Sequence, residues 1–477
     1  MIRSSVSGTW AVLFVVGLAV CPLGCGSDSG SQEEPCTAGT SEGCDGGQVC
    51  ELVAGGDPAC FAPVEVRGRV YESKAGAGVE GAVVAAIDSN GAIRSTLVET
   101  GEDGAYVLPI PMERDPDGKF EADSVTLRVD AAGYQSFPLP PRIALPIDLG
   151  TAAEDPDSKH LVVQNAATDV LLLPRADGGS GLAVVSGHVT GAVVSGFLVV
   201  AADGDVAVAS GLTASDGKFR LFNVPKGELT LSAFRQGAYA PAESVTVDQD
   251  LVTGVELDAS QDGLSTVSGS ISLVNVSGNP QTSVILVLAS TFDPVLVRGE
   301  APLGLRAGGV ANAFSIEGVP PGTYVALAAF ENDGLVRDPD TSIGGTDLVT
   351  VEVDGSGSPV TLSEGFKVTG ALEVVSPGGD GMETIAVAEP KLVWADDSSE
   401  DGYDLAIYSG QGEKVFEDTG VGKVTGSATV SYTWKSAGME PGMIYQFRVR
   451  SYRDKKGGGR TYISATEDLK GVFIFAP

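Results

Sequence analysis

Residues 213–229 read Thr-Ala-Ser-Asp-Gly-Lys-Phe-Arg-Leu-Phe-Asn-Val-Pro-Lys-Gly-Glu-Leu. Asp216-Gly217, placed ahead of an alternating run that begins at Phe219, predicts a tight hairpin turn, because glycine tolerates positive φ and the aromatic ring can pack into a sandwich. Val224-Pro225-Lys226-Gly227 predicts a second turn, in which proline presets φ and glycine closes the bend. These residues build a fold and perform no chemistry.

The same ordered pattern occurs three times along the chain. The copies contain Val66-Arg67-Gly68-Arg69-Val70 with Asp103-Gly104-Ala105-Tyr106, Val185-Ser186-Gly187-His188-Val189 with Asp216-Gly217-Lys218-Phe219, and Val267-Ser268-Gly269-Ser270-Ile271 with Asn312-Ala313-Phe314. The third copy diverges, because Asn312-Ala313 stands where the others have Asp-Gly. Three copies of one pattern predict serial structural modules.

Short apolar or alternating runs fill the chain after Cys60, separated by Gly, Pro, Asp and Asn. Examples are residues 83–87, 125–129, 229–233 and 284–288. Runs of this length, with almost no helical periodicity, predict an all-β fold made of serial sandwiches. At roughly 100 residues per sandwich, the chain after Cys60 has room for about four.

The order V-x-G-x-V, G-A-V-V, T-x-x-D-G-x-Y/F, V-P-x-G and A-x-G-Y resembles the carboxypeptidase regulatory-like domains, which are also described as transthyretin-like or Cna-B-like. The resemblance implies Greek-key sandwiches of seven strands. The expected fold class is therefore all-β, with tandem Greek-key sandwiches of immunoglobulin-like or transthyretin-like type after a small disulfide-rich segment.

The C-terminal stretch from about Lys367 has a different pattern. Pro390 to Trp394, Tyr403 to Tyr408 and Met439 to Arg450 resemble a fibronectin type III domain. The resemblance implies that Trp394 packs in the core. It also implies that Tyr445 forms a tyrosine corner, with its ring buried and its hydroxyl bonded to a nearby backbone group.

The first residues have the features of an export signal. An apolar run from Trp10 to Val20 follows Arg3 and is too short to span a bilayer. It ends in Pro22-Leu23-Gly24-Cys25, which resembles a bacterial lipobox, and we expect Cys25 to be lipidated. Cys21, preceded by Leu18-Ala19-Val20, is the second candidate for lipidation. An ordinary signal peptide without lipidation is the alternative.

Four further cysteines cluster at Cys36, Cys44, Cys50 and Cys60. In an exported chain an even set within so short a stretch predicts two disulfides that staple a segment too small to bury its own core. The spacing leaves three pairings open. A zinc site is the alternative, although the cluster has no Cys-x-x-Cys pair and no nearby histidine.

Charge limits the classes of partner. The chain has 30 Lys and Arg against 63 Asp and Glu, a net charge of −33. Nucleic acid is excluded as a partner, because phosphate backbones are bound by clustered positive charge. We interpret the acidity as a solvated surface, with an acidic cation-binding face as the alternative.

Catalytic constellations are absent from the sequence, so we predict no enzyme, no catalytic residue, no cofactor and no metal. The two histidines, His160 and His188, are not followed by the glutamate that a zinc carboxypeptidase needs, and no Gly-x-Ser-x-Gly elbow is present. We interpret His188 as an ordinary strand residue. Asp396-Asp397 and Glu400-Asp401 are expected in solvent. The loop Asp115–Asp123 offers calcium-type oxygens without the regular spacing, so a plain acidic loop is expected.

These observations give a domain plan. It comprises a lipoprotein signal peptide (1–24), a flexible stalk (25–35), a two-disulfide segment (36–60), three regulatory-like domains (64–176, 182–260 and 264–365) and a fibronectin-like domain (366–477). We expect a rod held at the outer membrane or cell surface by its N-terminal lipid, with a structural or adhesive role and protein or glycan partners. The alternative is an array of carbohydrate-binding modules.

Overall fold

The computed structural model describes residues 36, 43–45, 48–72, 76–88, 92–120, 123–139, 142–176, 178–274, 276, 280–293, 299–328, 335–336, 348–435 and 438–477. This part of the chain consists of strands and turns, with no α-helix and two short 3-10 helices, η1 (Leu149–Thr151) and η2 (Ala289–Thr291). The predicted all-β fold is confirmed. The described residues include no helix that is long and apolar enough to span a membrane. The predicted signal peptide and stalk, with Cys21 and Cys25, lie outside the described residues.

The cysteine-rich segment forms a small antiparallel sheet of β1 (Val49–Glu51) and β2 (Ala59–Phe61). Disulfides join Cys36 to Cys50 and Cys44 to Cys60. The two predicted disulfides are confirmed, and the pairing that the spacing left open is settled. In this oxidised form the sulfur atoms are not thiolates, the form in which cysteine binds zinc.

The segment is attached to the first sandwich mainly at Arg114, and the backbone N–H of Met112 also donates to Glu51. Arg114 Nε donates to the carboxylate of Glu51, and both side chains are buried. The Arg114 guanidinium also lies 4.7 Å from the ring centroid of Phe61. Together these contacts fix the stapled segment against the neighbouring sandwich.

The first sandwich surrounds a core that includes Val66, Val84 and Leu127. One sheet is built around β3 and the other around β5 and β8. The first sheet contains β3 (Val64–Glu72), β4 (Ala77–Gly78), β7 (Ala105–Ile110), β10 (Ala153–Glu154), β11 (Leu161–Val163) and β12 (Val170–Leu172), and the second contains β5 (Val83–Ile87), β6 (Val98–Glu99), β8 (Ser124–Asp130) and β9 (Ile147–Asp148).

The second sandwich has a three-stranded and a four-stranded sheet around Val185, Phe197 and Leu231. The sheet order is β16-β13-β19 on one side and β15-β14-β17-β18 on the other. The strands are β13 (Leu182–Thr190), β14 (Leu198–Asp203), β15 (Val206–Leu212), β16 (Lys218–Pro225), β17 (Gly227–Arg235), β18 (Ala238–Val247) and β19 (Leu251–Asp258).

The third sandwich has the sheet orders β23-β20-β28-β25, with β27 also on β20, and β22-β21-β24-β26. The strands are β20 (Ser265–Val274), β21 (Thr282–Leu288), β22 (Arg306–Val310), β23 (Ala313–Val319), β24 (Gly322–Ala328), β25 (Leu335–Val336), β26 (Val349–Val353), β27 (Val360–Thr361) and β28 (Phe366–Gly370).

The predicted domain boundary at residue 366 differs from the boundary in the structure. β28 pairs in parallel with β20, and Phe366 and Val368 are buried in the third core. The sequence break at Lys367 therefore falls inside the last strand of the third sandwich.

The fourth sandwich has the sheet orders β29-β31-β34 and β30-β37-β35-β32-β33, with β36 also on β35. Trp394 is fully buried at its centre, with its ring 5.6 Å from that of Tyr403. The strands are β29 (Val374–Ser376), β30 (Glu383–Ile385), β31 (Lys391–Ala395), β32 (Gly402–Ser409), β33 (Lys414–Gly422), β34 (Thr429–Thr433), β35 (Ile444–Asp454), β36 (Arg460–Ala465) and β37 (Val472–Phe475).

The three sequence repeats share one strand topology. The first strand of each repeat pairs antiparallel with the strand that follows the turn, so β3 pairs with β7, β13 with β16 and β20 with β23. The same first strand pairs in parallel with a strand near the end of its sandwich, which is β11, β19 or β28. Gly104 and Gly217 have φ of 79° and 82°, so the tight turns are present as predicted. The predicted hairpin is present locally, since Thr213 and Phe219 form an antiparallel bridge across the turn. Beyond this bridge the flanking strands β15 and β16 lie in different sheets, and Phe219 is buried between them.

Close packing explains why glycine occupies the central position of V-x-G-x-V. A Cβ on Gly187 would lie 2.1 Å from the Val255 carbonyl oxygen and 2.6 Å from Phe219 Cζ. The same conflict occurs at Gly68 with the hydroxyl of Tyr106 and at Gly269 with the ring of Phe314. The glycine of one repeat element and the aromatic residue of another are therefore direct neighbours, which makes the repeat a single packing unit.

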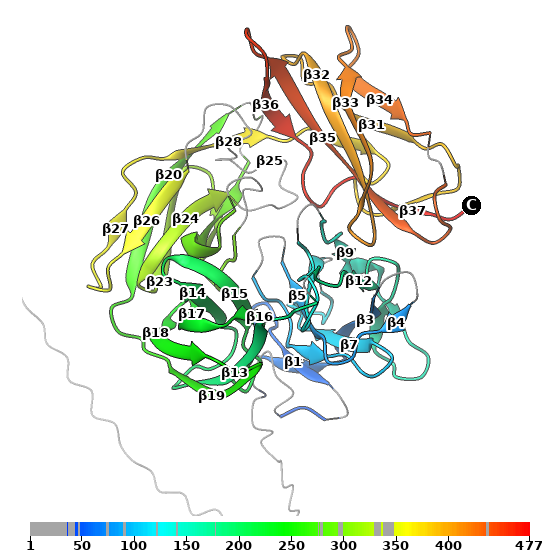
Figure 1. Cartoon of the computed structure of the whole chain (residues 1–477). Coiled ribbons are helices and arrows are strands. Elements are labelled where there is room, and N and C mark those ends of the chain that lie inside the picture. The colour runs from blue at the N-terminus through cyan, green and yellow to red at the C-terminus, as the bar shows by residue number, and fades with distance from the viewer. Residues whose placement is uncertain are drawn as a thin grey trace, which may run out of the picture.

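The sandwiches do not form a row, so the expected rod is wrong (Figure 1). Outward-facing Ala85 of the first sandwich and Leu198 of the second belong to one buried apolar cluster with the third core. Ile444 and Val472 of the fourth sandwich are buried with the core of the first. The chain doubles back because the outer faces of several sheets are apolar and cover one another.

Candidate functional site

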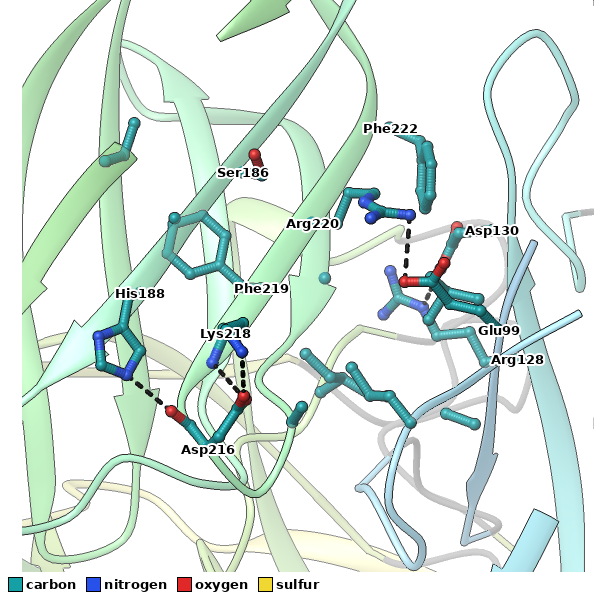
Figure 2. Close-up of a pocket in the computed structure, with 18 of the residues that line it drawn as sticks. Glu99, Arg128, Asp130, Ser186, His188, Asp216, Lys218, Phe219, Arg220 and Phe222 are labelled. Carbon is teal, nitrogen blue, oxygen red and sulfur yellow. Dashed lines mark hydrogen bonds and ion pairs between the residues drawn. The ribbon is translucent and has the colours of Figure 1, made fainter. Parts of the chain in front are cut away.

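A cleft of about 600 Å³ lies between the first and second sandwiches (Figure 2). Alternate residues of a strand point to opposite faces of the sheet, so Ser186 and His188 of β13 share the outer face of the second sandwich with Lys218, Arg220 and Phe222 of β16. This face meets the outer face of β5, β6 and β8 across the cleft. Val83, Ala85, Leu97 and Leu212 supply apolar surface between the polar groups.

One end of the cleft is organised by the Asp-Gly turn of the second repeat. His188 Nε2 lies 2.6 Å from the carbonyl oxygen of Asp216 and must donate to it. Lys218 Nζ pairs with the Asp216 carboxylate at 2.6 Å. The Lys218 hydrogen bond and charge lower the pKa of Asp216. This end therefore holds a charged pair and a half-buried histidine.

The other end contains two ion pairs. Arg220 lies 3.3 Å from Glu99 across the cleft, with both side chains about half exposed. Phe222 lies beside Arg220, with its ring centroid 5.9 Å from the guanidinium. Arg128 pairs with Asp130 at 2.7 Å, and both of those side chains are largely buried. The cleft thus combines matched charges with apolar strips, an arrangement that suits a polar, uncharged ligand.

The cleft lacks the geometry of a hydrolase among the residues that the structure describes. His188 donates to a backbone carbonyl, and Ser186 Oγ donates to the carbonyl oxygen of Val252 at 3.5 Å. Nucleophilic catalysis needs the serine and histidine bonded to each other. The strand position predicted for His188 is confirmed, and its sequence neighbours gave no indication of the cleft that it lines.

His160 belongs to a separate cluster on the first sandwich. Its Nδ1 lies 2.6 Å from Glu65 Oε1, and the other oxygen of Glu65 accepts from Arg67. Arg67 also pairs with Asp155 at 3.2 Å. These contacts form a continuous network of ion pairs, and they tie β3 to the loop before β11.

The proposed acidic loop at Asp115 is a turn stabilised by its own side chain. Asp115 Oδ1 accepts hydrogen bonds from the backbone N–H groups of Asp117 and Lys119, at 2.9 and 2.8 Å. This carboxylate oxygen is therefore occupied by the loop itself. Glu121 and Ala122 lie outside the described residues.

The expectation that Glu400 lies in solvent is wrong. Its side chain is buried, with 5% of the residue exposed, and its Oε2 has no hydrogen-bond partner in the described structure. Burial, with the nearby charges of Asp396 and Asp397, raises the pKa of Glu400. Sequence reasoning missed this burial because an acidic, serine-rich stretch between two strands looks like an exposed loop.

The contacts expected of Trp394 and Tyr445 are confirmed. Tyr445 is 4% exposed, and its hydroxyl accepts a hydrogen bond of 3.0 Å from the backbone N–H of Glu440. Burial is the main cause that raises the pKa of Tyr445. The Pro-Gly-x-x-Tyr segment was therefore sufficient to predict both the buried ring and its backbone partner.

No protein-family model matches the chain, and no curated protein matches it. Among solved structures, it is similar to the Bacillus anthracis TIE protein, at 11% identity, covering 83% of this chain and 67% of that one with a TM-score of 0.17. It is also similar to a streptococcal ancillary pilin, at 14% identity, covering 64% and 99% with a TM-score of 0.16. A tetra-tandem repeat of a large adhesion protein has 12% identity, coverage of 85% and 100%, and a TM-score of 0.14. With TM-scores of this size, none of these likenesses transfers a function to the chain.

Proposed function

We propose that the protein is an exported, lipid-anchored scaffold without enzymatic activity, which presents a fixed block of β-sandwiches at the bacterial outer membrane or cell surface in a structural or adhesive role. The first three sandwiches would be carboxypeptidase regulatory-like domains, and the fourth a fibronectin type III domain.

The observation that supports this role is the joining of the sandwiches by shared apolar clusters and by hydrogen bonds. Asn223 of the second sandwich has φ of 56° and donates to the carbonyl oxygens of Ala131 and Tyr134 in the first. Arg142 of the first donates to the Gln411 carbonyl oxygen of the fourth at 2.7 Å. Gln236 of the second donates to the Glu317 carbonyl oxygen of the third at 2.9 Å. Sandwiches that are joined at each of these interfaces would present a rigid surface, unlike sandwiches connected only by flexible linkers.

Export is supported by the two disulfides, since such bonds persist in oxidising compartments. Anchoring is supported by Leu23-Gly24-Cys25 after a short apolar run. Gly26, in place of aspartate after the lipidated cysteine, favours the outer membrane by its resemblance to lipoprotein sorting.

Metabolic labelling of the full chain with a palmitate analogue, followed by membrane fractionation, tests the anchor. We expect label in the outer-membrane fraction for the wild type and none for Cys25→Ser. Cys21→Ser is the matched control and should keep the label. Label that survives Cys25→Ser but is lost in Cys21→Ser would move the anchor to Cys21, and an unlabelled wild type would contradict lipidation.

A second candidate function, carbohydrate binding, is favoured by the cleft between the first and second sandwiches. Paired carboxylates and guanidinium groups can accept from and donate to sugar hydroxyls, and Phe222 offers one aromatic surface beside them. The scaffold remains our first proposal, because aromatic residues make up only 6% of the chain and most serve its cores.

A further inference from the structure

The loop between β31 and β32 gathers three acidic side chains at one end of the fourth sandwich. Asp396 and Asp397 directly follow β31, and Glu400 lies two residues before β32. An acidic loop alone would be an ordinary solvated turn. This loop differs because Glu400 is 5% exposed and its Oε2 is buried without a hydrogen-bond partner in the described structure.

A buried carboxylate oxygen without a partner has to be neutralised, because desolvation of the charge is costly. Protonation of Oε2 would remove this charge. A bound cation would supply positive charge and would also take the unpartnered oxygen as a ligand.

The protein's own cations are engaged elsewhere around this loop. Lys423 Nζ lies 3.5 Å from the backbone carbonyl oxygen of Glu400 and 3.7 Å from Asp401, and not at the Glu400 carboxylate. Arg453 Nε donates to the carbonyl oxygen of Ser399 at 2.6 Å. Both cations therefore contact the backbone of this loop, and in the described structure neither forms an ion pair with the Glu400 carboxylate.

The neighbouring carboxylates are oriented by hydrogen bonds that leave ligand atoms available. Tyr403 Oη donates to Asp396 Oδ1 at 2.8 Å, and the backbone N–H of Asp397 donates to the same hydroxyl. Ser451 Oγ donates to Asp397 Oδ2 at 2.8 Å. Among the described residues Asp396 Oδ2 has no such bond, so Asp396 and Glu400 each offer an oxygen.

From this arrangement we propose that residues 396–401 bind a calcium ion, with Asp396 and Glu400 as ligands and Asp397 as the adjacent negative charge. The three carboxylates are not all within 4.8 Å of one another, so binding requires the side chains to turn toward the ion. Calcium accepts about six to eight oxygens in irregular geometry, including waters, whereas magnesium demands a near-ideal octahedron. The proposal is independent of the scaffold function.

Terbium luminescence tests the site directly, because Tb³⁺ substitutes for Ca²⁺ and is excited by nearby aromatic rings. Tyr403 is bonded to Asp396, and its ring lies 5.6 Å from that of Trp394. In the full chain, treated first with chelator, we expect saturable sensitised emission that millimolar Ca²⁺ displaces. Glu400→Gln and Asp396→Asn should each weaken it by at least about tenfold. Glu364→Gln, an exposed carboxylate of the third sandwich, is the matched control and should leave it unchanged.

Thermal unfolding supplies the second readout and checks that the variants fold. Calcium should raise the unfolding temperature of the wild type and of Glu364→Gln, and should not change that of Glu400→Gln. Without calcium, Glu400→Gln should be at least as stable as the wild type, because it removes an unpaired buried charge. Wild-type protein without calcium-displaceable emission would overturn the proposal, as would full emission from Glu400→Gln. A wild type whose unfolding temperature does not respond to calcium would also overturn it.

Discussion

Arg128 Nη1 donates a hydrogen bond of 2.7 Å to Glu300 Oε2, although 172 residues separate them in sequence. Arg128 belongs to the first sandwich and Glu300 to the third. Arg128 Nη2 donates to the Ser210 carbonyl oxygen of the second sandwich at 2.9 Å, and Arg128 Nε pairs with Asp130 at 2.7 Å. Burial opposes the charge, but Asp130 and Glu300 outweigh it and raise the pKa of Arg128. One guanidinium therefore links three sandwiches and stays charged.

Replacement of Arg128 should weaken the block. Arg128→Met leaves the carboxylates of Asp130 and Glu300 unpaired at a largely buried position, so we expect the free energy of unfolding to fall by about 3–5 kcal/mol. Denaturant unfolding of the full chain measures this. Arg220→Met is the matched control, because its pair with Glu99 joins the same first two sandwiches with both side chains about half exposed. It should cost less than about 1 kcal/mol. Equal effects would mean that Arg128 does not organise the junction.

The glycine of the repeat should tolerate no side chain. In Gly187→Ala the new methyl group meets the Val255 carbonyl oxygen and the Phe219 ring, so the strand or the ring must move. We expect a loss of about 1–3 kcal/mol in the free energy of unfolding. Gly422→Ala is the control, since a Cβ on that strand glycine has nothing within 4 Å. A wild-type denaturant midpoint for Gly187→Ala would refute the proposed packing unit.

The tyrosine contact in the fourth sandwich is testable by removing one oxygen atom. Tyr445→Phe keeps the buried ring and leaves the Glu440 N–H without its acceptor, so local stability should fall by about 1–2 kcal/mol. Hydrogen exchange of β35 and β37 in the full chain reports this locally. Tyr408→Phe, in the same sandwich, should change nothing, because its hydroxyl has no backbone donor in the described part of the chain. Unchanged exchange in Tyr445→Phe would mean that the hydroxyl bond adds no stability.

Local signals in the sequence predicted local structure well. Asp216-Gly217 predicted a tight turn and Tyr445 a backbone partner, because each of these contacts joins residues a few positions apart. The buried ring of Trp394 followed from the resemblance to a fibronectin type III domain. The relation between sandwiches was not predictable in this way. Ala85 and Leu198 look like ordinary strand residues, and only the fold shows that they face outward into a shared cluster.

The candidate sites show the same division. His188 was correctly placed on a strand, but the cleft that it lines needs Glu99 and Arg128 from another sandwich, more than 50 positions away in the chain. Glu400 was wrongly placed in solvent, because its burial depends on how its loop packs against the distant strand β35. The sequence shows which of these residues are charged, but it does not show which residues surround them in the fold.

Glycan binding separates the two candidate functions. We expect a glycan array probed with residues 36–477 to show weak binding or none, because the cleft offers one half-buried aromatic ring, Phe222, and its two arginines are already paired. A dedicated sugar module should hold some glycan with a Kd of roughly micromolar to millimolar strength. Saturable binding that Phe222→Ala abolishes and Phe416→Ala preserves would make carbohydrate binding the primary function.

The central claim is that the sandwiches form one fixed block at the cell surface. Small-angle X-ray scattering of residues 36–477 in solution tests it most directly, with Arg128→Met as the comparison. We predict a compact wild-type particle in which the fourth sandwich lies against the first, and a larger radius of gyration for Arg128→Met. An elongated wild-type particle, about four sandwiches long and unaffected by Arg128→Met, would contradict the block and restore the rod.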